Sequence, residues 1–110
     1  MQPESIYTGA KRLNGEMTRI LSGVDLRDVS AADQASVRTL KRELTDLTID
    51  IRDYELAETR VEQQKLARSA RKGLASIEQH MLDLSQHNIF SAIEVAELSA
   101  RIDLLTQEVV

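Results

Sequence analysis

Apolar residues recur at intervals of three and four along the middle of the chain, from Ser30 to Lys72. This spacing places one side chain per turn on a single face, which is typical of an amphipathic helix. Two polar residues, Glu58 and Lys65, occupy later positions of the same stripe. We therefore predict one long central helix over residues 30–72, begun by a Ser30 cap with Asp33 three residues later. Its apolar seam consists of Val37, Leu40, Leu44, Leu47, Ile51, Tyr54 and Val61.

The C-terminal end of this helix has two alternatives. Residues 65–73 carry four cations and no acid and end at Gly73, a composition typical of a helix C-terminus. Beyond Gly73 the apolar stripe resumes out of phase, and Ser76 with Gln79 can cap a new helix. The helix therefore either continues to about residue 86 or breaks near Gly73, with a separate helix over residues 74–86.

Shorter amphipathic helices flank the central one. The pattern predicts the first over residues 4–21, ended by Gly23, on the stripe Ile6, Ala10, Leu13, Met17, Ile20 and Val24. Asn88 is a helix stop, and Ser91 with Glu94 forms a capping box, so we predict the last helix over residues 91–108. Phe90 and Val95 are placed to pack on each other as a hydrophobic staple.

The last helix is apolar on a broad face. We expect it to bury one stripe against the other helices and to widen that stripe with a second set of apolar residues. The first stripe is Ile93, Ala96, Ala100 and Leu104, and the second set is Leu98, Ile102, Leu105 and Val109. A face of this width normally packs on more than one neighbour.

Composition supports an all-helical fold. Of 110 residues 42% are hydrophobic and 3% are aromatic, and there are four glycines and one proline, too few for the turns of an all-β protein. We predict a single all-α domain over residues 1–110, an antiparallel helical bundle built on the long central helix.

The length of the central helix predicts assembly. Residues 31–72 would span about 63 Å, whereas the first and last helices cover about 25 Å each. Each uncovered Leu, Ile or Val of the seam costs on the order of 1.5–3 kcal/mol relative to burial. We therefore expect a homodimer that buries the seam, parallel or antiparallel, because a two-fold contact is the commonest solution.

Charge and cysteine content narrow the function. The net charge of −4 gives no general attraction to nucleic acid or anionic membranes. The absence of cysteine excludes a thiolate metal site and a cysteine nucleophile. No apolar run approaches a membrane span and the first residues lack a secretory pattern, so we expect a cytoplasmic protein without a membrane partner.

One basic cluster is a candidate site for anions or nucleic acid: Lys65, Arg68, Arg71 and Lys72. Four cations within two turns make a local positive patch. The cluster lacks an aromatic residue for base stacking and adjoins an acidic segment. A helix C-terminal charge cluster or an ion-pair surface between subunits is the favoured interpretation.

A weaker candidate for a metal site is His80, Asp83 and His87, spaced for one helical face. The favoured interpretation is that these residues lie on the polar side of the helix and meet water.

No catalytic constellation, phosphate loop or cofactor motif is evident, so we expect neither an enzyme nor a cofactor. The sequence favours a non-enzymatic helical module for protein–protein interaction, an adaptor, assembly chaperone or regulator, that acts as a homo-oligomer and binds another protein. The alternative is a nucleic-acid-binding protein that uses the cluster at residues 65–72.

Overall fold

The computed structural model describes residues 5–110, and within this range the chain is all-helical, as predicted, without strands. Residues 5–110 form four α-helices and one short 3₁₀ turn. They are α1 (Ile6–Ser22), η1 (Leu26–Asp28), α2 (Ala31–Leu56), α3 (Arg60–Ser85) and α4 (Ala92–Glu108). Position 4 of the predicted first helix lies outside the described residues.

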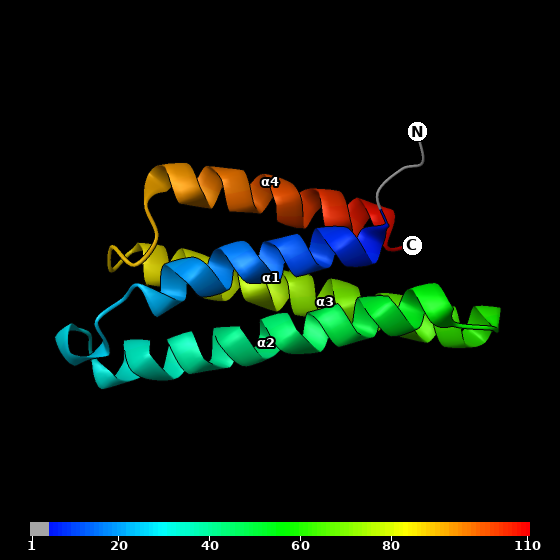
Figure 1. The fold of residues 1–110 in the computed structure, drawn as a ribbon, viewed down its shortest axis with the longest axis horizontal. Helices are drawn as coiled ribbons and strands as arrows, with labels where there is room; N and C mark the ends of the chain where they lie inside the picture. The colour runs from blue at the N-terminus through cyan, green and yellow to red at the C-terminus, as the bar shows by residue number, and fades with distance from the viewer. Residues whose placement is uncertain (1–4) are drawn as a thin grey trace.

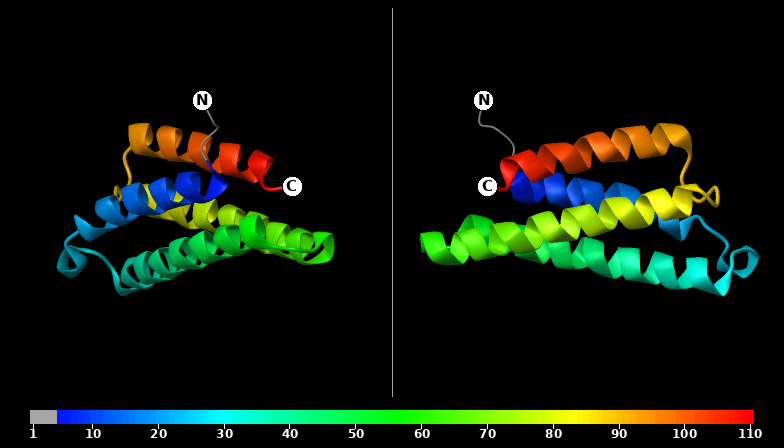
Figure 2. Two further views of the ribbon diagram at one scale, coloured as in Figure 1. Left: turned by 45° about the vertical axis from the view of Figure 1, so that its right-hand side comes forward. Right: turned by 180° about the vertical axis from the view of Figure 1, so that it is seen from behind.

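The four helices lie side by side, and each runs opposite to the one before it (Figure 1). α2 packs on α1 and α3, and α4 packs on α1 and α3 from the other side. The single-chain bundle measures 47 × 29 × 17 Å along its principal axes. The end formed by α2 and α3 projects past the neighbouring ends of α1 and α4 (Figures 1 and 2). Within residues 5–110, α4 contacts α1 and α3, and each of the other helices likewise contacts two neighbours.

The predicted long helix is wrong, because the chain turns back at Ala57–Thr59 and not at Gly73. α2 ends at Leu56, Ala57 is extended, and the Thr59 hydroxyl caps α3 by accepting a hydrogen bond from the Glu62 backbone N–H at 3.2 Å. The helices expected over 30–72 and 74–86 are thus replaced by α2 and α3, 26 residues each. Gly73 lies inside α3 with ordinary helical geometry.

Local capping signals explain the other helix ends. The Ser30 hydroxyl accepts from the Asp33 N–H at 3.1 Å, while the Asp33 carboxylate turns to His87 at 2.8 Å. Ser91 and Glu94 form a full capping box at the start of α4. Asn88 lies in the connection between α3 and α4 and adopts a left-handed conformation with φ of 65°, which prevents α3 from continuing.

The core lies between all four helices. Six of the seven residues of the predicted seam are buried there, from Val37 to Tyr54, whereas Val61 is 78% exposed. They are covered by apolar residues of the same chain: Ala10, Leu13, Met17, Leu21, Ala67, Ala70, Leu74, Ile77, Met81, Leu84, Phe90, Leu98, Ile102, Leu105 and Val109. The expectation that one chain is too short to cover the seam is therefore wrong, since α3 folds back along it.

Within residues 5–110, none of the helices combines the length and the apolar character needed to cross a membrane.

Candidate functional site: the outer face of α4 and the α1–α4 groove

α4 has two apolar faces on opposite sides. Leu98, Ile102 and Leu105 are buried against the other helices. Ile93 and Leu104, by contrast, are 73% and 55% exposed. The predicted order of the two sets is thus reversed, because the set expected to widen the buried stripe is the set that forms it. Helical rotation of about 100° per residue places the outer stripe about 180° from the buried face.

The outer face of α4 is a continuous stripe, which we call the outer stripe: Ile93, Ala96, Ala100 and Leu104. All four residues are exposed. By helical rotation they lie within about 80° of one another, with Glu97 and Asp103 on the two sides. A helix that is apolar on opposite sides is normally covered on both. Within residues 5–110 only the inner face of α4 is covered.

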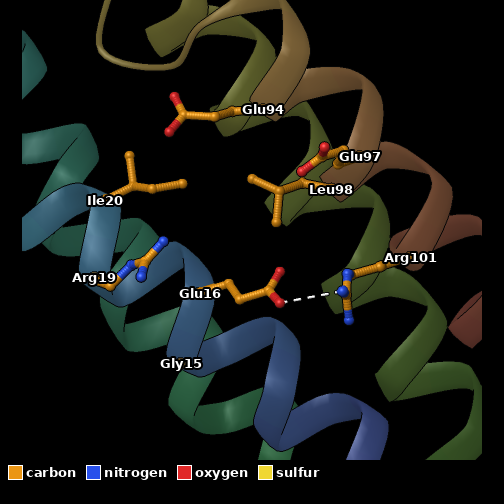
Figure 3. Close-up of a pocket in the computed structure, with 8 residues that line it drawn as sticks. All are labelled: Gly15, Glu16, Arg19, Ile20, Glu94, Glu97, Leu98 and Arg101. Atoms are coloured by element: carbon orange, nitrogen blue, oxygen red, sulfur yellow. Dashed lines mark ion pairs between the residues drawn. The ribbon is translucent and has the colours of Figure 1, made fainter.

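A groove separates α4 from α1 beside this stripe. It has a volume of about 370 Å³. Figure 3 shows Ile20 of α1 and Leu98 of α4 pointing toward each other across it, with charged side chains around them. Arg101 of α4 bridges the groove with an ion pair to Glu16 of α1, at 3.2 Å between Nη2 and Oε1. The lining residues are Gly15, Glu16, Arg19, Ile20, Glu94, Glu97, Leu98 and Arg101.

The groove is lined by both charged and apolar side chains, a mixture typical of protein–protein contact surfaces. Its lining offers carboxylates, guanidinium groups and two apolar side chains, and Glu94 is engaged in the cap of α4. The Arg101–Glu16 pair is partly exposed at both residues, 40% and 38% for the side chains, so it contributes less than about 1 kcal/mol. Across the groove, a Cβ added at Gly15 would meet no atom within 4 Å. The wall at that point is open to an approaching side chain.

The basic cluster lies in the middle of α3. Lys65, Arg68, Arg71 and Lys72 are all exposed, and α3 continues to Ser85. A role as a helix C-terminal charge cluster is therefore excluded, since these cations sit far from the negative end of the helix. Lys72 borders a groove between α2 and α3 that also includes Glu43, Asp46 and Asp50.

The predicted metal candidates do not converge. His80 Nδ1 lies 2.7 Å from Glu43 Oε1, and His87 Nδ1 lies 2.8 Å from Asp33 Oδ1, so the two imidazoles pair with different carboxylates of α2. Asp83 accepts a hydrogen bond from Gln79 at 3.0 Å. Over the described part of the chain, no group of three His, Cys, Asp or Glu side chains is arranged to hold a metal ion.

Glu43 is a structural centre that the sequence did not reveal. Its carboxylate accepts a hydrogen bond from the Ser76 hydroxyl and also contacts His80. Nearby, Asp50 accepts from the Ser69 hydroxyl at 2.7 Å. Acidic residues of α2 thus face small hydroxyl residues of α3. The available signal was that Ser69, Gly73 and Ser76 share one side of a helix. The acceptors of the Ser69 and Ser76 hydroxyls, however, are 19 and 33 residues away in the sequence.

Two more exposed apolar residues lie at the turn between α2 and α3. Leu56 is 69% exposed and Val61 is 78% exposed. Acidic Glu55, Glu58 and Glu62 surround them in sequence. This apolar pair has two residues where the outer stripe has four, and its members lie on two different helices, at the end of α2 and the start of α3.

Comparisons with protein-family models, with curated proteins and with solved structures found no match to this chain.

Proposed function

We propose that this protein is a non-enzymatic module for protein–protein interaction, that it acts as a homo-oligomer, and that the outer stripe of α4 is its main contact surface. The observation that carries the proposal is the bare apolar face of α4, with Ile93 and Leu104 73% and 55% exposed. The seam on α2 cannot drive association of two chains, because its residues from Val37 to Tyr54 are already buried within one chain.

The expected affinity follows from the size of the stripe. Fully burying an Ile or Leu side chain contributes about 1.5–3 kcal/mol, so a two-fold contact that covers four of them gains roughly 6–12 kcal/mol at most. Association itself costs about 4–15 kcal/mol in lost translational and rotational freedom. These opposing quantities are of similar size, so the net gain is about 8 kcal/mol at most, which corresponds to a dissociation constant in the micromolar range or weaker.

Light scattering coupled to size-exclusion chromatography tests this proposal. The wild-type protein, loaded at increasing micromolar concentrations, should rise in mass from 12.4 kDa toward twice that value. Ile93→Glu and Leu104→Glu should each keep the mass at the monomer value, because each places a charge in the contact. Circular dichroism should show unchanged helicity, since both positions are exposed.

Val61→Glu is the matched control for this experiment. Val61 is as exposed as Ile93 but lies at the turn between α2 and α3. Its substitution should leave the association unchanged. A wild-type protein that stays monomeric, or an association that responds to Val61→Glu and not to Ile93→Glu, contradicts the proposal.

A second candidate function is binding of nucleic acid or another polyanion through the basic cluster of α3. It is favoured by one observation: the four cations are exposed in mid-helix and make no ion pair with the described residues. The acidic residues of the neighbouring α2 weaken the local positive potential. This candidate therefore predicts weak binding with a steep dependence on salt.

Fluorescence anisotropy with labelled RNA and DNA at low salt tests the second candidate. A variant with alanine at positions 65, 68, 71 and 72 should lose binding. A control with four exposed cations replaced elsewhere should retain it; these are Lys11, Arg19, Arg38 and Arg42. Equal loss in both variants would indicate only an effect of net charge, and binding unaffected by the first variant would exclude the cluster.

A further inference from the structure

We infer that α4 packs against α4 of a second copy of this chain in an antiparallel, two-fold contact, with Ile93 opposite Leu104 of the second copy and Ala96 opposite Ala100 of the second copy. This inference rests on the proposed function and specifies its partner and geometry. It follows from the positions of the stripe residues, from their sizes and from the charges beside them.

The outer stripe can pair with its own copy about a single two-fold axis. In an antiparallel pair related by a two-fold axis, opposite positions have a constant sum of residue numbers. The pair Ile93 and Leu104 gives 197, and the pair Ala96 and Ala100 gives 196. One axis near positions 98 and 99 therefore satisfies both pairs, with a large apolar side chain at each end of the contact and small ones in the middle.

The small residues in the middle set the distance between the helices. Alanine side chains allow helix axes to approach to about 8 Å, the lower end of the usual range. At this distance Ile93 and Leu104 can pack beside the alanines rather than hold the two helices apart. Antiparallel packing also aligns the helix dipoles favourably. The outer face of α4 is open to such a neighbour, because α1 and α3 lie on its other side (Figure 1).

The charges beside the stripe are complementary under the same axis. Glu97 and Arg101 lie on the same side of the stripe by helical rotation. In an antiparallel two-fold pair, the same side of the stripe in both copies lies on the same side of the contact. Glu97 is therefore nearly level with Arg101 of the second copy, and this pairing occurs twice per dimer. Glu97 is exposed and makes no ion pair within residues 5–110, whereas Arg101 already pairs with Glu16. A guanidinium group has five N–H donors and can hold both carboxylates.

Cysteine cross-linking tests the register, and the natural chain has no cysteine to interfere. An Ala96→Cys chain and a mass-tagged Ala100→Cys chain are mixed and mildly oxidised. The mixed disulfide should exceed the cross-links of either variant alone by roughly an order of magnitude, because only that pair lies within disulfide distance in an antiparallel contact. Cross-links within each single variant, instead of between them, would show a parallel pair and overturn the inference.

Charge exchange provides an independent test. Glu97→Arg alone and Arg101→Glu alone should each weaken dimerisation about tenfold, because like charges then face each other across the axis. An equimolar mixture of the two variants should recover the wild-type affinity, since the two chains are again complementary. No recovery in the mixture contradicts the predicted juxtaposition of residues 97 and 101.

The two proposals fail in different ways. A wild-type chain that remains monomeric contradicts both. A dimer that Ile93→Glu disrupts, but that gives neither the mixed disulfide nor the charge rescue, retains the contact surface of the proposed function and overturns only the antiparallel register.

Discussion

Glu43 links α2 to α3 through two contacts of one carboxylate. The Ser76 hydroxyl donates to one oxygen, and His80 Nδ1 lies 2.7 Å from the other. The Glu43 side chain is only 19% exposed, so its charge is partly removed from water and depends on these partners. From the sequence, His80 was part of the weak metal candidate. No local pattern joins two residues that are 37 positions apart.

We predict that Glu43→Ala lowers the free energy of unfolding by about 1–3 kcal/mol, because it leaves Ser76 and His80 without their acceptor. Urea denaturation followed by circular dichroism measures the change.

Asp46→Ala is the matched control, since Asp46 is an exposed acid of the same helix. This substitution should change the stability by less than about 0.5 kcal/mol. Equal effects of the two substitutions would show that the contacts of Glu43 contribute nothing beyond its charge.

At the scale of single helices, periodicity located the apolar residues but not the turn between α2 and α3. A continuous helix and two antiparallel helices place the same residues of α2 on one face, so spacing cannot distinguish them. The distinguishing signal was Thr59 followed by Glu62, a threonine and an acid three residues apart, as at a capped helix start. The cations before Gly73 are typical of a helix C-terminus, but α3 continues past them to Ser85.

The same limit applies to α4. Both sets of its apolar residues have helical spacing, and spacing alone does not determine which set faces inward. Contacts with α1 and α3 decide this, and they bury Leu98, Ile102 and Leu105. The start of α4 was easier to predict, because the capping box of Ser91 and Glu94 is a local interaction.

Gly73 gives a prediction about α3 itself. A Cβ added there meets only Leu47 Cδ1, at an ordinary contact distance of 4.0 Å. Gly73→Ala should therefore raise the stability by about 0.5–1 kcal/mol, because alanine loses less entropy than glycine in a helix. Thermal or urea unfolding measures the gain.

Gly9→Ala is the comparison, since a Cβ there would approach Leu105 Cδ2 to 3.3 Å. The gain should be smaller or absent because the leucine must move. A destabilised Gly73→Ala protein would contradict the position of Gly73 as a tolerant site inside a continuous helix.

At the scale of the whole molecule, folding back of α3 changes which surface is left for a partner. The apolar seam of α2 from Val37 to Tyr54 is part of the core. The most exposed large apolar side chains are Leu56, Val61, Ile93, Leu104 and Val110. The sequence correctly predicted an all-helical chain, because helix type depends on local spacing. It could not predict the contact surface, because exposure depends on how all four helices pack.

A concentration series of ¹H–¹⁵N NMR spectra tests the central proposal most directly, because it reports association residue by residue. From tens of micromolar to about one millimolar, the outer-stripe account predicts shift changes or broadening that concentrate on Ile93, Ala96, Ala100 and Leu104, while Val61 and Arg68 stay constant. Changes centred on the turn between α2 and α3 or on the basic cluster, or spectra that do not change at all, would contradict it.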